Sequence, residues 1–132
     1  MPEFGYKGTP PRPWMRVVLI APDGTSRVLE AVADTGNPLP LIVSSDVMAA
    51  CCHLGGPGTE TNFGRLEGGF LRVRIPETGV DAMMLGYASD QVTAAIRDSS
   101  QDFELLVGLP LLRRLEYGGD ADHFWEIGRA HV

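Results

Sequence analysis

The chain has 132 residues and a formal net charge of -6, with 44% hydrophobic and 21% charged residues. This length fits one domain that buries a core without metal or disulfide staples. An acidic chain lacks the clustered Lys and Arg that displace counterions from phosphates, so we expect no nucleic-acid partner. Its 16 glycines and 10 prolines indicate frequent turns and short elements, which favours β structure.

The sequence gives no sign of a membrane or secretory segment. No stretch approaches the roughly 20 apolar residues that span a bilayer, and Met1–Met15 contains proline, glycine and charge where a signal peptide needs an apolar centre. Cys51 and Cys52 are adjacent and cannot link distant segments, which fits a reducing compartment. We therefore expect a cytoplasmic protein with no membrane partner.

The N-terminal part predicts an arm followed by a hairpin. Residues 1–14 carry three prolines within four positions and no periodicity, so we expect a flexible arm. Short β-branched runs at Met15–Ile20 and Arg27–Ala33 flank the turn residues Pro22–Thr25. This pattern predicts a β-hairpin that runs directly into Asp34.

The middle of the chain predicts a helix and a second hairpin. Ser44–Asp46 offers N-cap chemistry for a short helix through Leu54, stopped by Gly55–Pro57. In Asn62–Ile75 the pair Gly68-Gly69 precedes an alternating run of apolar and basic residues. This alternation predicts a hairpin whose tip lies at the two glycines.

The C-terminal part continues with short elements. Ser89–Arg97 fits a helix or a loop equally well. The other expected elements are a turn at Pro76–Gly79, a strand at Val80–Leu85, a buried strand at Phe103–Val107, a helix at Leu109–Leu115 and two strands within Tyr117–Trp125. The predicted class is mainly β with two short helices.

The tripeptide Asp34-Thr35-Gly36 places a carboxylate at the end of a predicted strand, two residues before a glycine. A carboxylate that activates water sits well on a loop leaving a strand, with a small neighbour that lets backbone and substrate approach. Average composition makes the tripeptide alone only moderately specific. Its context decides what it means.

Three ordered segments together resemble the retropepsin-like, or retroviral-type, aspartic peptidases, including their single-domain bacterial members. They are VLEAVADTG (Val28–Gly36), GGFLRVR (Gly68–Arg74) and LLVGLPLL (Leu105–Leu112). The resemblance covers 15–127, which we take as the domain. The final IGRAHV resembles translated sequencing-adaptor read-through, so 128–132 is treated as a tail outside it.

The resemblance implies a retropepsin-like half-barrel that forms a homodimer and places Asp34 beside Asp34 of its partner. Two carboxylates so close share a proton and titrate as a unit. One member would act as general base toward water while the protonated member polarises the scissile carbonyl. The implied activity is that of an aspartic endopeptidase on a peptide or protein substrate, with no cofactor or metal.

The resemblance also implies roles for neighbouring residues. Thr35 would hydrogen-bond across the two-fold axis, and Gly36 would lie against the substrate backbone. Asn37, followed by Pro38, stands where the family usually has Ala or Ser, so it is expected to shape the substrate-binding wall. A mobile flap over the substrate would be formed by Gly68, Gly69 and Phe70.

Other interpretations are weaker. Cys51-Cys52-His53 lacks a second ligand pair at zinc-like spacing, and Ser44 and Ser45 fit a helix cap better than a nucleophile because no G-x-S-x-G is present. Two alternatives to the peptidase stay open. One is the same fold without catalysis, serving as a dimerisation or peptide-binding module, and the other is an unrelated small barrel in which the Asp34 turn is structural.

Overall fold

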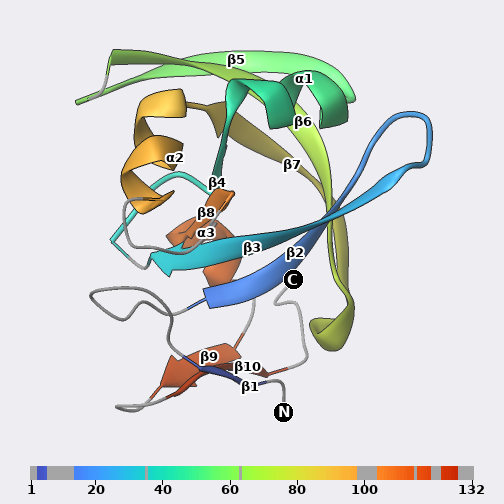
Figure 1. Cartoon of the computed structure of the whole chain (residues 1–132), viewed down its shortest axis with the longest axis vertical. Coiled ribbons are helices and arrows are strands. Elements are labelled where there is room, and N and C mark those ends of the chain that lie inside the picture. The colour runs from blue at the N-terminus through green and yellow to red at the C-terminus, as the bar shows by residue number, and fades with distance from the viewer. Residues whose placement is uncertain are drawn as a thin grey trace.

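The computed structural model describes residues 3–5, 14–34, 36–62, 64–97, 104–114, 116–119 and 123–127. Strands dominate the described part (Figure 1). The strands are β1 (Glu3–Gly5), β2 (Trp14–Ile20), β3 (Ser26–Asp34), β4 (Leu41–Val43), β5 (Leu54–Thr61), β6 (Gly64–Ile75), β7 (Val80–Ala88), β8 (Leu105–Gly108), β9 (Glu116–Gly119) and β10 (His123–Ile127). The helices are α1 (Ser45–Cys51), the 3-10 turn η1 (Pro76–Thr78), α2 (Asp90–Arg97) and α3 (Leu109–Leu112).

The main sheet has seven strands in the order β2-β3-β8-β4-β7-β6-β5, and β2 also pairs with β6. This additional pairing curls the sheet into a barrel-like form. The predicted mainly β class is therefore confirmed. A second sheet, in the order β1-β10-β9, lies below the main one in Figure 1.

The β2–β3 hairpin forms where the sequence predicts it. Its turn is closed by the Ala21 amide, which donates to Thr25 O, and by the Thr25 amide, which donates to Asp23 Oδ1 at 2.9 Å. Gly24 takes a φ of 88°, a conformation that glycine adopts without strain. Hydrogen bonding with Thr25 holds the pKa of the exposed Asp23 carboxyl below its ordinary value.

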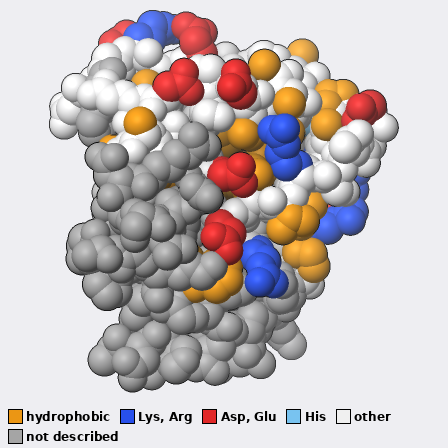
Figure 2. Space-filling view, in the orientation of Figure 1, with side chains coloured by type: hydrophobic (Ala, Val, Ile, Leu, Met, Phe, Trp, Pro, Cys, Tyr) orange, Lys and Arg blue, Asp and Glu red, His pale blue; other side chains and the backbone are white. Residues whose placement is uncertain are grey.

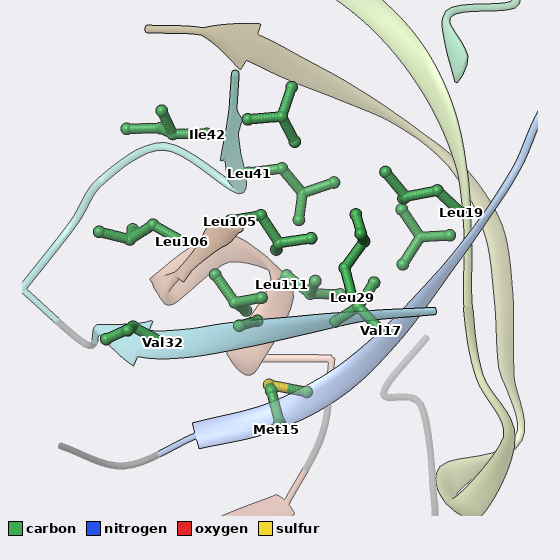
Figure 3. Packing of buried hydrophobic residues seen from close by; sticks show 14 of the residues in the cluster. Met15, Val17, Leu19, Leu29, Val32, Leu41, Ile42, Leu105, Leu106 and Leu111 are labelled. Carbon is green, nitrogen blue, oxygen red and sulfur yellow. The ribbon is translucent and has the colours of Figure 1, made fainter. Parts of the chain in front are cut away.

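The core lies inside the curled sheet. Figure 3 shows Leu29, Leu41 and Leu105 pointing into this interior, while Ile42 and Leu106 point to the opposite side. The alternation follows from the period of two along each strand. The first group is almost fully buried, and so is the second, because α2 packs against β4 and β8.

Strand β8 occupies the middle of the arrangement. It runs parallel to β3 and antiparallel to β4, so it separates the two strands that precede and follow the Asp34 loop, residues 34–40. All four of its residues are buried. The prediction of a buried strand within Phe103–Val107 is confirmed for the part that is described, and β8 extends by one residue to Gly108.

The three α-helices are short and pack around the sheet (Figure 1). Ser44 caps α1 as predicted, its Oγ accepting a hydrogen bond from the Val47 amide at 3.1 Å. However, α1 ends at Cys51 rather than Leu54, because Leu54 already belongs to β5. The ambiguous segment Ser89–Arg97 is helical from Asp90 onward, as α2.

The prediction for the second hairpin is wrong about its tip. Strands β5 and β6 are joined by a turn between Thr61 and Gly64, and Gly64 has a φ of 90°. Gly68 and Gly69 lie inside β6, where they pair with Gly56 and Gly55. The two glycines therefore belong to the paired body of the hairpin.

The N-terminal end of the chain differs from expectation, whereas the strands predicted near the C-terminal end are present. Within the predicted flexible arm 1–14, Glu3–Gly5 forms strand β1 and pairs with β10; residues 6–13 lie outside the described part. The strand, turn and strand predicted within Tyr117–Trp125 correspond to β9 and β10. The tail 128–132 is outside the described residues.

The described surface is mixed in character. Figure 2 shows acidic and basic side chains interspersed over one face, with apolar side chains between them. On the β6–β7 sheet, Asp81 pairs with Arg72 at 3.0 Å and with Arg74 at 3.4 Å. The Arg72 hydrogen bond lowers the pKa of the exposed Asp81 carboxyl.

None of the described helices has the length and apolar character needed to cross a bilayer.

Candidate functional site

Asp34 is the last residue of β3, opposite Gly108 of the parallel strand β8. It is half-buried, and its Oδ1 accepts a hydrogen bond from the Gly36 amide at 2.9 Å. This bond fixes the carboxyl group, and within the described residues its second oxygen makes no hydrogen bond. Thr35, the middle residue of the tripeptide, lies outside the described residues. Asp34 therefore presents one oriented, accessible carboxylate oxygen.

The rest of the Asp34 loop is closed by its own hydrogen bonds. The Asn37 amide donates to Asp34 O at 3.2 Å, and the Leu39 amide donates to Asn37 Oδ1 at 3.0 Å. Pro38 and Pro40 carry no amide hydrogen, and their rings restrict the backbone. The loop is thus a preformed turn rather than a loose connection.

The junction of β8 and α3 supports this loop from below. The Gly108 amide donates to Pro40 O at 3.0 Å, and the Leu109 amide donates to Asn37 O at 2.9 Å. A Cβ placed on Gly108 would overlap the Leu39 carbonyl oxygen. Only glycine permits this approach, so the late glycine of the LLVGLPLL segment is part of the site. The resemblance includes this segment, but the sequence does not reveal the contact that requires Gly108.

A cavity of about 560 Å³ opens beside Asp34. Its apolar walls come from β4, β6, β8, α2 and the Asp34 loop, and Asp34 lies on its border. The residues that line it are Asp34, Gly36, Asn37, Pro38, Leu39, Ile42, Thr59, Glu60, Thr61, Asn62, Leu66, Val92 and Leu106. This volume suits a side chain or a short peptide segment.

The tip of the β5–β6 hairpin forms one wall of the cavity. Thr59 pairs with Leu66 and Glu60 pairs with Arg65, so the two pairs face opposite sides of the hairpin. Leu66 is buried on the cavity side. Glu60 Oε1 lies 3.3 Å from Arg65 Nη1 in an exposed ion pair. Of the two acids in the described lining, Glu60 is thus held in an ion pair and Asp34 is not.

The expected flap residues take other positions. Gly69 is buried beneath α1. A Cβ at this position would lie only 2.6 Å from Met48 Sδ and 2.8 Å from Cys52 Sγ. Phe70 sits opposite Leu54 on one side and Leu85 on the other, and neither Gly68 nor Phe70 lines the Asp34 cavity. Of the predicted site residues, the structure groups Asp34, Gly36 and Asn37 at the cavity and places Gly68, Gly69 and Phe70 away from it.

A second cavity, of about 700 Å³, lies between β3, α1 and α2. Val92 of α2 faces the Asp34 cavity, whereas Thr93 and Ala94 face this second one. Its charged lining residues are Arg27, Asp46, Asp90 and Glu104. Asp90 is engaged by Ser45, whose amide and Oγ donate to its two carboxylate oxygens at 2.9 and 2.8 Å. This contact ties the starts of α1 and α2 together.

The Cys51-Cys52-His53 segment has structural contacts. Cys51 is buried, and burial raises the pKa of its thiol. Cys52 Sγ donates to Leu54 O at 3.2 Å, and His53 Nε2 lies 2.6 Å from Ile20 O. In the described ranges, no three His, Cys, Asp or Glu side chains are grouped so that they could hold a metal ion.

Comparisons with known proteins give one similarity. No family model matches the chain, and no curated protein matches it. Among solved structures, the chain is similar to EIAV protease complexed with the inhibitor HBY-793, at 16% sequence identity and a TM-score of 0.44. The match covers 76% of this chain and 85% of that chain. A similarity at this level does not establish a family, so the function must be argued from the residues around Asp34.

Proposed function

We propose that this chain is one half of a homodimeric aspartic endopeptidase in which Asp34 of each protomer supplies one carboxylate. The observation that carries the proposal is the setting of Asp34. Its Oδ1 is held by the Gly36 amide at 2.9 Å, its other oxygen is accessible, and it borders a cavity of about 560 Å³ with apolar walls. A fixed carboxylate beside a partly apolar cavity is suited to acid–base chemistry on a bound chain.

The proposal of a dimer follows from the number of carboxylates. Hydrolysis by this chemistry needs one carboxylate to accept a proton from water and a second, protonated one to polarise the carbonyl. Glu60 is the other acid in the described lining, but its carboxylate is held in an exposed ion pair with Arg65, so Asp34 still needs a second acid. Asp34 of the partner subunit would supply it, with Thr35 of each chain holding the pair together.

In the proposed reaction, the two carboxylates share one proton because both cannot ionise easily at short distance. The ionised member takes a proton from water as the water oxygen attacks the scissile carbonyl carbon. The protonated member donates to the carbonyl oxygen. Collapse of the tetrahedral intermediate breaks the C–N bond: the amine leaves with the proton from the dyad, and a hydroxyl group of the intermediate gives its proton back to the ionised carboxylate as the carbonyl re-forms.

The role of the flap is assigned to the hairpin tip. Thr59, Thr61, Asn62 and Leu66 line the cavity from that side, so they take the role that the resemblance implies for Gly68, Gly69 and Phe70. Closure of this tip over a bound peptide would exclude water from the developing oxyanion. Gly36 would lie against the substrate backbone.

The test is cleavage of a peptide library by the wild-type chain, Asp34→Asn and a matched control, Asp23→Asn. Asp23 makes the same local contact as Asp34, since its Oδ1 accepts from the amide two residues later at 2.9 Å, but it lies in the β2–β3 turn. We expect pepstatin-sensitive cleavage by wild type and Asp23→Asn, and a loss of about 10³-fold or more for Asp34→Asn. Equal cleavage by wild type and Asp34→Asn would refute the proposal. A dimer that cleaves no peptide at any pH would identify the non-catalytic module instead.

A further inference from the structure

The side chain of Asn37 has a defined orientation at the edge of the Asp34 cavity. Its Oδ1 accepts a hydrogen bond from the Leu39 amide at 3.0 Å. Because an N–H group can donate only to an acceptor, the atom facing Leu39 must be the oxygen, and the NH2 group must occupy the other position. The contact thus settles which end of the amide is free.

The backbone of Asn37 is fully engaged. Its amide donates to Asp34 O at 3.2 Å, and its carbonyl oxygen accepts from the Leu109 amide at 2.9 Å. The side chain is half-buried, lines the cavity that Asp34 borders, and has no hydrogen-bond partner for Nδ2 among the described residues. Nδ2 is therefore a hydrogen-bond donor whose orientation is fixed by the Oδ1 contact and which borders the cavity.

Among the described residues 36–40, no backbone donor remains. The Gly36 amide is used by Asp34 Oδ1, the Asn37 amide by Asp34 O, and the Leu39 amide by Asn37 Oδ1. Pro38 and Pro40 have no amide hydrogen. Across residues 36–40, Asn37 Nδ2 is the donor left for a ligand in the cavity.

We infer that Asn37 Nδ2 donates a hydrogen bond to a backbone carbonyl oxygen of the extended peptide bound beside Asp34. This inference rests on the proposed function. A peptide that enters the cavity loses water from its carbonyl groups, and a carbonyl left without a donor costs free energy. Ionised Asp34 only accepts, so it cannot serve such a carbonyl. Asn37 supplies the missing donor and fixes the peptide relative to the reacting carbonyl.

The experiment uses the full-length chain and a peptide that the wild type cleaves. Asn37→Asp keeps an oxygen for the Leu39 amide but replaces the NH2 donor by an acceptor. Asn37→Ala removes both functions. Asn62→Asp adds a charge to the same cavity without touching the Leu39 contact; because Asn62 belongs to the hairpin tip assigned to the flap, this variant can lose activity itself and serves as the reference for the thioamide effect. Each variant is assayed at its own pH optimum, with its thermal midpoint measured in parallel.

The substrate is varied together with the enzyme. Each backbone amide near the scissile bond is replaced in turn by a thioamide, whose sulfur accepts hydrogen bonds poorly. We expect one thioamide position to lower kcat/KM about 10-fold in the wild type and in Asn62→Asp, and to have no effect in Asn37→Asp and Asn37→Ala. With the unmodified peptide, Asn37→Asp should lose about 10- to 100-fold in kcat/KM at an unchanged thermal midpoint.

The outcomes separate the two claims. If Asn37→Asp cleaves as well as wild type, or if the thioamide effect persists in it, Asn37 only holds the loop and the inference is wrong. A fall in thermal midpoint for Asn37→Ala with unchanged kcat/KM would also overturn the inference. If the wild-type chain cleaves no peptide, the proposed function fails and this inference falls with it.

Discussion

At the scale of single residues, the site depends on groups that hold other groups. Gly36 holds the carboxylate of Asp34, Leu39 holds the amide of Asn37, and Gly108 lets the loop lie against β8. None of these contacts involves a long side chain. The reactive geometry therefore rests on the backbone of two segments, residues 34–40 and the β8–α3 junction.

Gly108 gives the first stability prediction. In Gly108→Ala, the new methyl group overlaps the Leu39 carbonyl oxygen, and backbone atoms must shift to admit it. We expect a loss of about 2–3 kcal/mol in the free energy of unfolding, measured with urea. The control is Gly55→Ala, because a Cβ on Gly55 meets nothing within 4 Å. A Gly108→Ala protein as stable as the control would show that the loop does not rest on β8.

At the scale of elements, the hairpin β5–β6 shows where local sequence signals fail. A glycine pair in a strand pattern indicates either a turn or a close approach. No side chain fits at Gly69 because α1 packs over it, and none fits at Gly68 because the Pro57 carbonyl lies against it. Both causes are tertiary contacts, so the local pattern predicts a tip at Gly68-Gly69 although the turn lies at 61–64.

The position of this turn can be tested directly. Gly64 has a φ of 90°, which an alanine adopts only with strain. We expect Gly64→Ala to lower the free energy of unfolding by about 1 kcal/mol, against almost no change for Gly55→Ala in the paired neighbouring strand. Equal stability of the two variants would place the turn elsewhere.

Other elements are predictable because their signals are local. The β2–β3 hairpin is bounded by a Pro-Asp-Gly turn, and α1 begins at a serine cap. The same kind of pattern places Asp34 at the end of its strand. By contrast, the cavity lining joins residues from four segments far apart in sequence, and these include Leu66, Val92 and Leu106. No periodicity within one segment reveals that those side chains meet.

At the scale of the whole molecule, the barrel-like sheet places Asp34 at the border of the cavity described above, and each chain contributes one such aspartate. The β8 strand inserts between β3 and β4 and so ties the loop to the centre of the fold. Because Glu60, the other acid of the described lining, is held in an ion pair with Arg65, the proposed chemistry is complete only in a dimer. Activity should therefore depend on protein concentration near the dissociation constant of that dimer.

The most direct test of the central claim mixes two kinds of chain. Wild-type and Asp34→Asn chains are refolded together in varying ratios at fixed total concentration, dimer formation is verified by light scattering, and peptide cleavage is measured. If each dimer needs Asp34 from both chains, activity falls with the square of the wild-type fraction, to about one quarter at equal amounts. Mixing with Asp23→Asn should leave activity nearly unchanged. A linear fall, to about one half at equal amounts of wild type and Asp34→Asn, would mean that each chain acts alone and would contradict the shared dyad.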